Sequence, residues 1–190
     1  MQSDGMYFTR GYYKEFLRYD LRKWVLQNQF DKDTQKYNTL IFPTKAGQSM
    51  TPHQLTRLFE LLDQIAAAIE EAKNGFKSFE ARFHLGDHLY CTVSGAPYFK
   101  IQLRRWYIPK KLLEERKMLL DVNNYQKDLR PSQDGAVFGL YCFNVFRQIV
   151  SDAIAQFGVQ KCECEEPSIC SFCSPYTCEI QQLKNQNQAE

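Results

Sequence analysis

One nine-residue pattern occurs twice in this chain of 190 residues, and the repetition limits the folds that the chain can adopt. Residues 16–24 read Phe-Leu-Arg-Tyr-Asp-Leu-Arg-Lys-Trp, and residues 98–106 read Tyr-Phe-Lys-Ile-Gln-Leu-Arg-Arg-Trp. The two segments align without a gap at an offset of 82 residues. We therefore expect two tandem copies of one small module.

A second pair of matching segments follows at an offset of 88 residues. Pro43-x-x-x-Gly47 matches Pro131-x-x-x-Gly135, and an apolar pattern with helical spacing comes after each glycine. Thr51 followed by Pro52 is a typical helix start. The apolar positions of the two expected helices, over residues 52–73 and 141–157, are Leu55, Leu58, Leu62, Ile65, Ala66 and Ile69 and, in the second copy, Phe143, Phe146, Val150, Ala153, Ile154 and Phe157.

The repeated nine-residue segments alternate apolar and polar residues, which is the period of a β-strand. The side chains expected to face a core are Leu17, Tyr19 and Leu21 in the first copy and Phe99, Ile101 and Leu103 in the second. A leading hairpin is expected only in the second copy, around Gly86. The sequence thus predicts an α+β fold of two sheet-helix modules, at residues 6–75 and 80–158, followed by a Cys-rich acidic tail at 159–190.

The basic residues are concentrated ahead of the tail. The whole chain carries a net charge of +2, but residues 161–190 hold two Lys and five Glu, a net of −3. The preceding 160 residues therefore carry a net of +5. A basic, aromatic-rich body fits a polyanionic partner such as nucleic acid, although charge alone fits an ordinary solvated surface equally well.

Several classes of protein are not favoured by the sequence. No apolar run approaches the roughly 20 residues that a helix needs to span a bilayer. The N-terminus lacks the pattern of a secretory signal, so we expect an intracellular protein that does not enter a membrane. No Gly-rich phosphate loop, nucleophile elbow or zinc-protease motif occurs, and we therefore expect no enzymatic activity.

Five of the seven cysteines crowd into the tail. Without a signal peptide, such a cluster favours metal binding over a disulfide framework. Four thiolates can hold zinc tetrahedrally, and the Cys-x-x-Cys pair has a usual chelating spacing. A redox role and an unstructured tail remain alternatives. The candidate zinc ligands are Cys162, Cys164, Cys170, Cys173 and Cys178.

This order of elements resembles the positive cofactor four family of transcriptional coactivators, which bind single-stranded DNA. The likeness covers most of residues 6–157. In the second copy it is carried by three motifs, namely Phe83-x-Leu85-Gly86, Tyr98 to Tyr107, and Pro131-x-x-x-Gly135 leading into a helix. In the first copy it runs from Phe16 to Val25 and from Pro43 through the helix.

The resemblance implies a curved antiparallel sheet followed by a helix, with two such units paired through their helices and sheet edges. The paired sheets form a groove for unpaired DNA. Here one chain would supply both units as an intramolecular pseudo-dimer, either as a monomer or in a homo-oligomer. The resemblance also implies a nuclear location and a role beside transcription or replication proteins.

The resemblance further suggests site residues. The sheet-face arginine of the family matches Arg22 and Arg104. Its stacking aromatic falls at Val25 and Tyr107 or, with a shift of one residue, at Trp24 and Trp106. The full set of candidate nucleic-acid-binding residues is Arg18, Arg22, Trp24, Lys45, Tyr98, Lys100, Arg104, Arg105, Trp106 and Tyr107.

Two functions are therefore weighed. The first is a single-stranded nucleic-acid-binding protein, in which aromatic rings stack on bases and basic side chains neutralise phosphates. DNA is the expected ligand, and RNA stays open. The second is a protein-interaction adaptor that uses the same scaffold and a zinc-binding tail. A structural alternative to the stacking site is that Trp24 and Trp106 are core residues where the strand bends or bulges, and that the basic residues form a solvated face.

Overall fold

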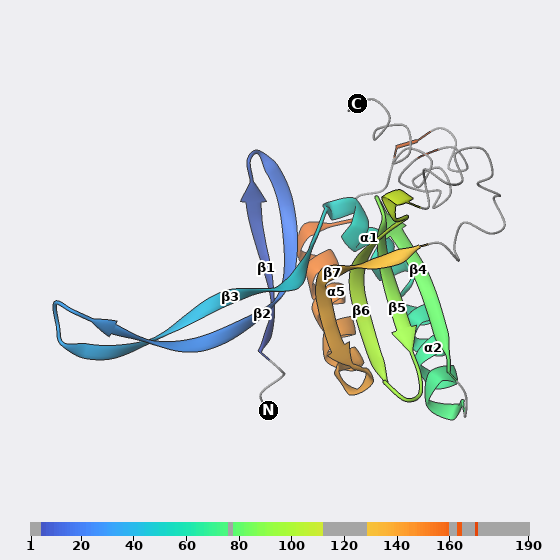
Figure 1. Ribbon diagram of the computed structural model, residues 1–190. Coiled ribbons are helices and arrows are strands. Elements are labelled where there is room, and N and C mark those ends of the chain that lie inside the picture. Colours follow the sequence, from blue (N-terminus) through green and yellow to red (C-terminus); the bar gives the residue numbers. More distant parts are fainter. Residues whose placement is uncertain (1–4, 76–77, 112–128, 160–162, 165–169, 171–190) are drawn as a thin grey trace.

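The computed structural model describes residues 5–75, 78–111, 129–159, 163–164 and 170. It confirms the predicted α+β class, with two antiparallel sheets in the orders β1-β2-β3 and β4-β5-β6-β7 (Figure 1). The elements are β1 (Met6–Tyr13), β2 (Phe16–Asp31), β3 (Lys36–Met50), α1 (Pro52–Glu60), α2 (Leu62–Asn74), β4 (Glu80–Gly86), β5 (Leu89–Ser94), β6 (Lys100–Tyr107), β7 (Arg130–Gly139), the 3-10 helix η1 (Leu140–Cys142) and α5 (Phe143–Phe157).

The alternation read from the two repeated segments places most of the expected side chains in the core. Tyr19, Leu21, Ile101 and Leu103 are buried there. Phe99 is an exception, because it precedes the first residue of β6 and is 46% exposed. The inward orientation expected for Phe99 is therefore wrong, since the strand period begins only after it.

The same irregularity occurs in both sheets at the offsets of the sequence repeat. In each sheet a β-bulge follows an arginine and precedes a tryptophan. The strand pairs at these places are Arg22 with Gly47 and Trp24 with Pro43 in the first sheet, and Arg104 with Gly135 and Trp106 with Pro131 in the second. The two matching motifs of the sequence thus face each other across neighbouring strands.

The glycine of each Pro-x-x-x-Gly motif leaves no room for a side chain, because the neighbouring strand lies too close. A Cβ atom on Gly47 would lie 2.8 Å from Arg22 Cα, and one on Gly135 would lie 2.8 Å from the backbone oxygen of Leu103. No side chain fits at such distances without movement of the neighbouring strand. The repeated glycine therefore reflects close approach of the strand that carries the arginine.

The helices begin and end largely where the sequence predicts. Thr51 caps α1 in a reciprocal capping box with Gln54. Gly75 and Gly158 follow the last residues of α2 and α5. The single helix expected over 52–73 is instead divided at Leu61 into α1 and α2. None of the helices in the described ranges is long and apolar enough to span a membrane.

Helices of one half of the chain pack against the sheet of the other half. Gln54 is fully buried, and its Nε2 atom donates a hydrogen bond of 2.9 Å to the backbone oxygen of Gly86 at the end of β4. At the end of α5, the Phe157 ring lies 5.7 Å from the ring of Tyr19 in β2. The two sheets and the helices consequently share one continuous hydrophobic core.

Strands β2 and β3 continue well past the first sheet. Strand β1 begins opposite Lys23 and pairs with β2 only from Lys23 back to Phe16, whereas β2 and β3 stay paired from Trp24 with Pro43 to Asp31 with Lys36. This two-stranded extension, called the arm below, projects away from the rest of the protein (Figure 1). The arm was not predicted from the sequence.

Candidate functional site

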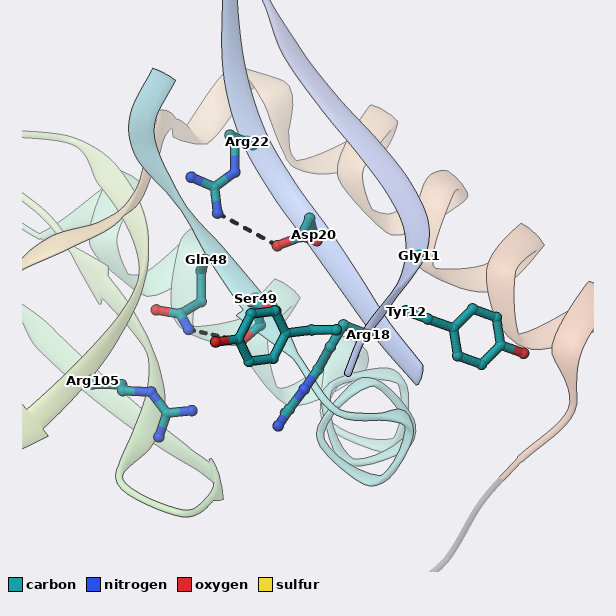
Figure 2. Close-up of a pocket in the computed structure, with 9 residues that line it drawn as sticks. Gly11, Tyr12, Arg18, Asp20, Arg22, Gln48, Ser49 and Arg105 are labelled. Carbon is teal, nitrogen blue, oxygen red and sulfur yellow. Dashed lines mark hydrogen bonds and ion pairs between the residues drawn. The ribbon is translucent and has the colours of Figure 1, made fainter. Parts of the chain in front are cut away.

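A groove of about 510 Å³ opens on the outer side of the first sheet, which is the side turned away from the core. Two elements of that sheet and one residue of β6 contribute most of its polar atoms, and Figure 2 shows how their side chains lie. The lining residues are Gly11, Tyr12, Tyr13, Arg18, Asp20, Arg22, Gln48, Ser49 and Arg105.

The strand period explains why polar residues of β2 meet in this groove. Tyr19 and Leu21 are buried in the core, so Arg18, Asp20 and Arg22 alternate with them on the opposite side of the sheet. The segment that the sequence analysis singled out thus supplies both the inner face and three of the groove residues.

Arg22 is fixed in place by two contacts. Its Nη1 atom donates a hydrogen bond of 2.9 Å to the backbone oxygen of Thr44, and its Nη2 atom lies 3.5 Å from Asp20 Oδ1. A guanidinium group has five N–H donors, so these contacts leave donors for a ligand. The pairing with β3 gives Arg22 a defined orientation on the sheet.

The other two arginines come from separate parts of the chain. Arg18 lies on β2, and its guanidinium makes no ion pair with the residues that the structure describes. Arg105 lies on β6, and its Nη1 atom donates a 2.7 Å hydrogen bond to the backbone oxygen of Asp87. Three guanidinium groups therefore surround the groove against the single carboxylate of Asp20, which favours an anionic ligand.

Two exposed tyrosines, Tyr12 and Tyr13, end β1 at the turn into β2, and they are 70% and 66% exposed. Gly11 pairs with Arg18, so strand alternation places Tyr13 on the side of the sheet that carries the arginines. The Tyr12 ring points away from the arginines, beyond β1 (Figure 2). The sequence analysis missed both residues, although the signal was present: two adjacent aromatic residues directly before a two-residue turn, with Lys14 at positive φ.

The remaining candidates of the first half lie outside the groove. Trp24 is half-buried beyond the bulge, and its ring meets the edge of the Tyr7 ring at 6.1 Å. Lys45 is exposed on β3 but does not line the groove. Of the predicted residues, the structure therefore gathers Arg18, Arg22 and Arg105 at one place.

The expectation of an exposed stacking ring is wrong for Trp106. Its side chain is only 6% exposed. The guanidinium of Arg82 on β4 lies 4.1 Å from the ring centre, and Tyr90 on β5 packs against the ring edge at 6.2 Å. Neighbouring strands thus cover the ring, a contact between distant residues that the strand period cannot predict.

The other candidates of the second half are spread over its sheet. Arg104 Nη1 donates hydrogen bonds to the backbone oxygens of Ser132 and Gln133, at 2.6 and 3.2 Å. Lys100 is half-buried, with its Nζ atom 5.6 Å from the ring centre of Tyr98. Tyr98 and Tyr107 are both exposed. None of these residues lines the groove on the first sheet.

On the outer side of the second sheet, neighbouring side chains pack around Trp106 and exclude solvent. Tyr90 and Thr92 are buried there, although neither belongs to the main core. Burial, together with the nearby positive charges of His88 and Arg57, lowers the pKa of His84 to about 4. His84 is therefore neutral at pH 7, and it belongs to a packed surface in this part of the protein.

The proposed zinc ligands fall mostly outside the described residues. Cys162, Cys173 and Cys178 lie there, while Cys164 and Cys170 are described and half-buried. Within the described ranges, no three His, Cys, Asp or Glu side chains come together as metal ligands. The zinc site of the tail stays a prediction.

Comparisons of the chain with models of known protein families, with curated proteins and with solved structures find no match. The function is therefore inferred from the residues of the groove.

Proposed function

We propose that this protein binds single-stranded nucleic acid, with DNA as the expected ligand, in the groove on the first sheet, and that it carries out no catalysis. One observation carries the proposal. Three arginines from two sheets, Arg18, Arg22 and Arg105, surround an open groove beside the exposed ring of Tyr13.

The arginines suit the backbone of a nucleic acid. A guanidinium group is planar and always charged, and it donates two parallel hydrogen bonds to phosphate oxygens. Arg22 is already oriented by Thr44, so less side-chain entropy is lost when it contacts a phosphate. Asp20, which lies 3.5 Å from Arg22 Nη2, offsets part of the positive charge.

The exposed ring of Tyr13 favours an unpaired strand over a duplex. A base can stack on an aromatic ring only when its face is free, and such stacking contributes about 1–3 kcal/mol per base. Bases inside a duplex are already stacked on each other. A groove that combines guanidinium groups with a free ring therefore selects single strands, through contacts that depend little on base sequence.

We also infer that the chain is an intramolecular pseudo-dimer of two related modules, as in the positive cofactor four family that it resembles. Equivalent contacts support this. Arg22 Nη1 donates to the backbone oxygen of Thr44, and Arg104 Nη1 donates to that of Ser132, at positions related by the repeat offsets. A role in transcription or replication, and a nuclear location, are part of the same proposal.

Fluorescence anisotropy of a labelled unpaired oligonucleotide and of its matched duplex, over a salt series, tests the proposal. The decisive variant is Arg18→Ala/Arg105→Ala. The matched control is Lys73→Ala/Arg147→Ala, which removes the same two charges from helices outside the groove.

The parent is expected to prefer the unpaired strand, and the groove variant to bind at least ~10-fold more weakly. Its slope of log affinity against log salt should fall by about 1.4, since each lost phosphate contact on a single strand removes about 0.7. The control variant should stay close to the parent. Equal losses in both variants, or no preference for the single strand, would refute the groove as the binding site.

A further inference from the structure

The arm carries one apolar face that nothing in the described structure covers. Along this face, Leu26 pairs with Ile41 and Phe30 pairs with Tyr37, and all four side chains are between 46% and 73% exposed. The two aromatic rings lie 5.1 Å apart. An apolar surface of this kind in water marks an interaction site, and a bare two-stranded ribbon has little stability of its own.

The arm is nevertheless a defined structure. At its tip, Asp31 Oδ1 accepts hydrogen bonds from the backbone N–H groups of Asp33 and Thr34, at 2.9 and 3.3 Å. Halfway along, Thr39 Oγ1 donates a 2.9 Å hydrogen bond to Asn28 Oδ1 across the two strands. The hairpin register is therefore set by the arm's own polar contacts.

The apolar pairs of the arm are placed symmetrically about a central polar pair. An aliphatic pair lies on one side of the Asn28–Thr39 pair and an aromatic pair lies on the other side, each two residues away. At about 3.4 Å per residue, the two pairs lie roughly 14 Å apart along the ribbon. A two-fold axis through Asn28–Thr39 would thus bring the aliphatic pair of one copy onto the aromatic pair of another.

The charge of the arm also favours a second copy of the chain as its partner. The arm from Trp24 to Pro43 contains two Asp and two Lys, so its net charge is zero and it gives a polyanion no advantage. Asp33 and Lys23 each lie five residues from Asn28. The same two-fold axis brings Asp33 of one arm to the level of Lys23 of the other, and the equal numbers of Asp and Lys keep two facing arms from repelling each other.

We propose that the arm docks face to face on the arm of a second copy of this chain and holds two molecules together. Two ribbons packed through their apolar faces form a small sheet sandwich, the usual arrangement for sheets with one apolar side. Each copy keeps its own groove on the first sheet, so the pair offers two grooves to one strand of nucleic acid. This proposal does not depend on the function of the groove.

Sedimentation velocity of the full chain over a wide concentration range, without nucleic acid, tests the docking. The disrupting variant is Leu26→Lys/Phe30→Lys. The matched control is Gln27→Lys/Gln29→Lys, which adds the same two charges to the same strand on the opposite face. Tyr37→Lys/Ile41→Lys repeats the disruption from β3.

The parent and the control are expected to dimerise, while both disrupting variants dimerise at least ~10-fold more weakly. Hydrogen exchange within residues 24–43 of the parent should slow as protein concentration rises. A monomeric parent, or a dimer that all three variants retain, would overturn the proposal. A parent that associates only after an oligonucleotide is added would overturn it as well. Unchanged affinity of the arm variants for an oligonucleotide too short to reach two grooves separates this test from that of the binding function.

Discussion

The two sheets share the same arginine, bulge and tryptophan, but their outer sides differ. In the first sheet the tryptophan is half-buried and the neighbouring surface is an open groove with exposed Tyr13. In the second sheet Trp106 is buried beneath Arg82 and beside Tyr90. The same local sequence thus lies on an open surface in one half and on a closed one in the other.

The extra strand of the second sheet explains much of this difference. Arg82 and His84 belong to β4, which pairs with β5 and has no counterpart in the first sheet among the described residues. A fourth strand therefore supplies the side chains that cover the second face. In the proposed function, the first half offers the binding surface, to which the second half adds Arg105.

The largest expected effect separates the two tryptophans. Truncating a buried aromatic side chain destabilises a fold by about 3–5 kcal/mol, so Trp106→Ala should lower the free energy of unfolding by that amount. Trp24→Ala should lose about 1–2 kcal/mol, because its ring is only half-buried. Urea denaturation measures both values. Equal losses would contradict the difference between an open and a closed face.

The repeated glycines should behave alike in both halves. Gly47→Ala and Gly135→Ala each push a methyl group against a neighbouring strand, and overpacking of this kind usually destabilises by about 1–3 kcal/mol. The same urea series tests this. A neutral result at one glycine alone would show that the two strand pairs are not equivalent at the bulge.

Because His84 is buried on the outer side of the second sheet, the free energy of unfolding should depend on pH. The pKa of His84 falls from 6.5 to about 4 in the folded protein, so the unfolded chain binds a proton first as pH decreases. The stability contributed by neutral His84 is present above pH 6.5 and is lost as pH falls toward 4. Between pH 7 and pH 5 this loss should be about 1–2 kcal/mol. Thermal unfolding of the parent and of His84→Gln measures it, and an unchanged pH dependence in the variant would count against a buried neutral His84.

The smallest expected effect concerns the cover over Trp106. A guanidinium above an aromatic ring contributes roughly 0.5–2 kcal/mol, so Arg82→Ala should destabilise the protein only slightly. It should also increase quenching of tryptophan fluorescence by iodide, because the ring becomes accessible. Arg57→Ala, on the surface of α1, is the control. Unchanged quenching would mean that Arg82 does not close this face.

The parts of the fold that depend on local pattern were predictable. Alternation in 16–24 and 98–106 gave the strands, and Thr51 with Pro52 gave the start of α1. The arm was not predictable, because most of its polar residues are Gln, Asn and Thr, which also occur readily in loops. The break at Leu61 was also missed, since the apolar spacing continues through it.

The candidate site was predicted in part. The strand period places Arg18 and Arg22 on one side of β2, and the groove contains both. Arg105 was proposed for its place in the repeat, but only tertiary structure shows that it joins the arginines of the other half. Trp106 failed as an exposed ring because Arg82, more than twenty residues away, covers it.

Photocrosslinking tests the central claim most directly, namely that single-stranded nucleic acid lies on the open face of the first sheet. An unpaired oligonucleotide with iodouracil bases would be irradiated with the full chain, and the crosslinked residues identified by mass spectrometry. We predict crosslinks at Tyr13, lost when Arg18 and Arg105 are replaced by Ala. Crosslinks confined to Tyr98 and Tyr107 of the second half would contradict the account.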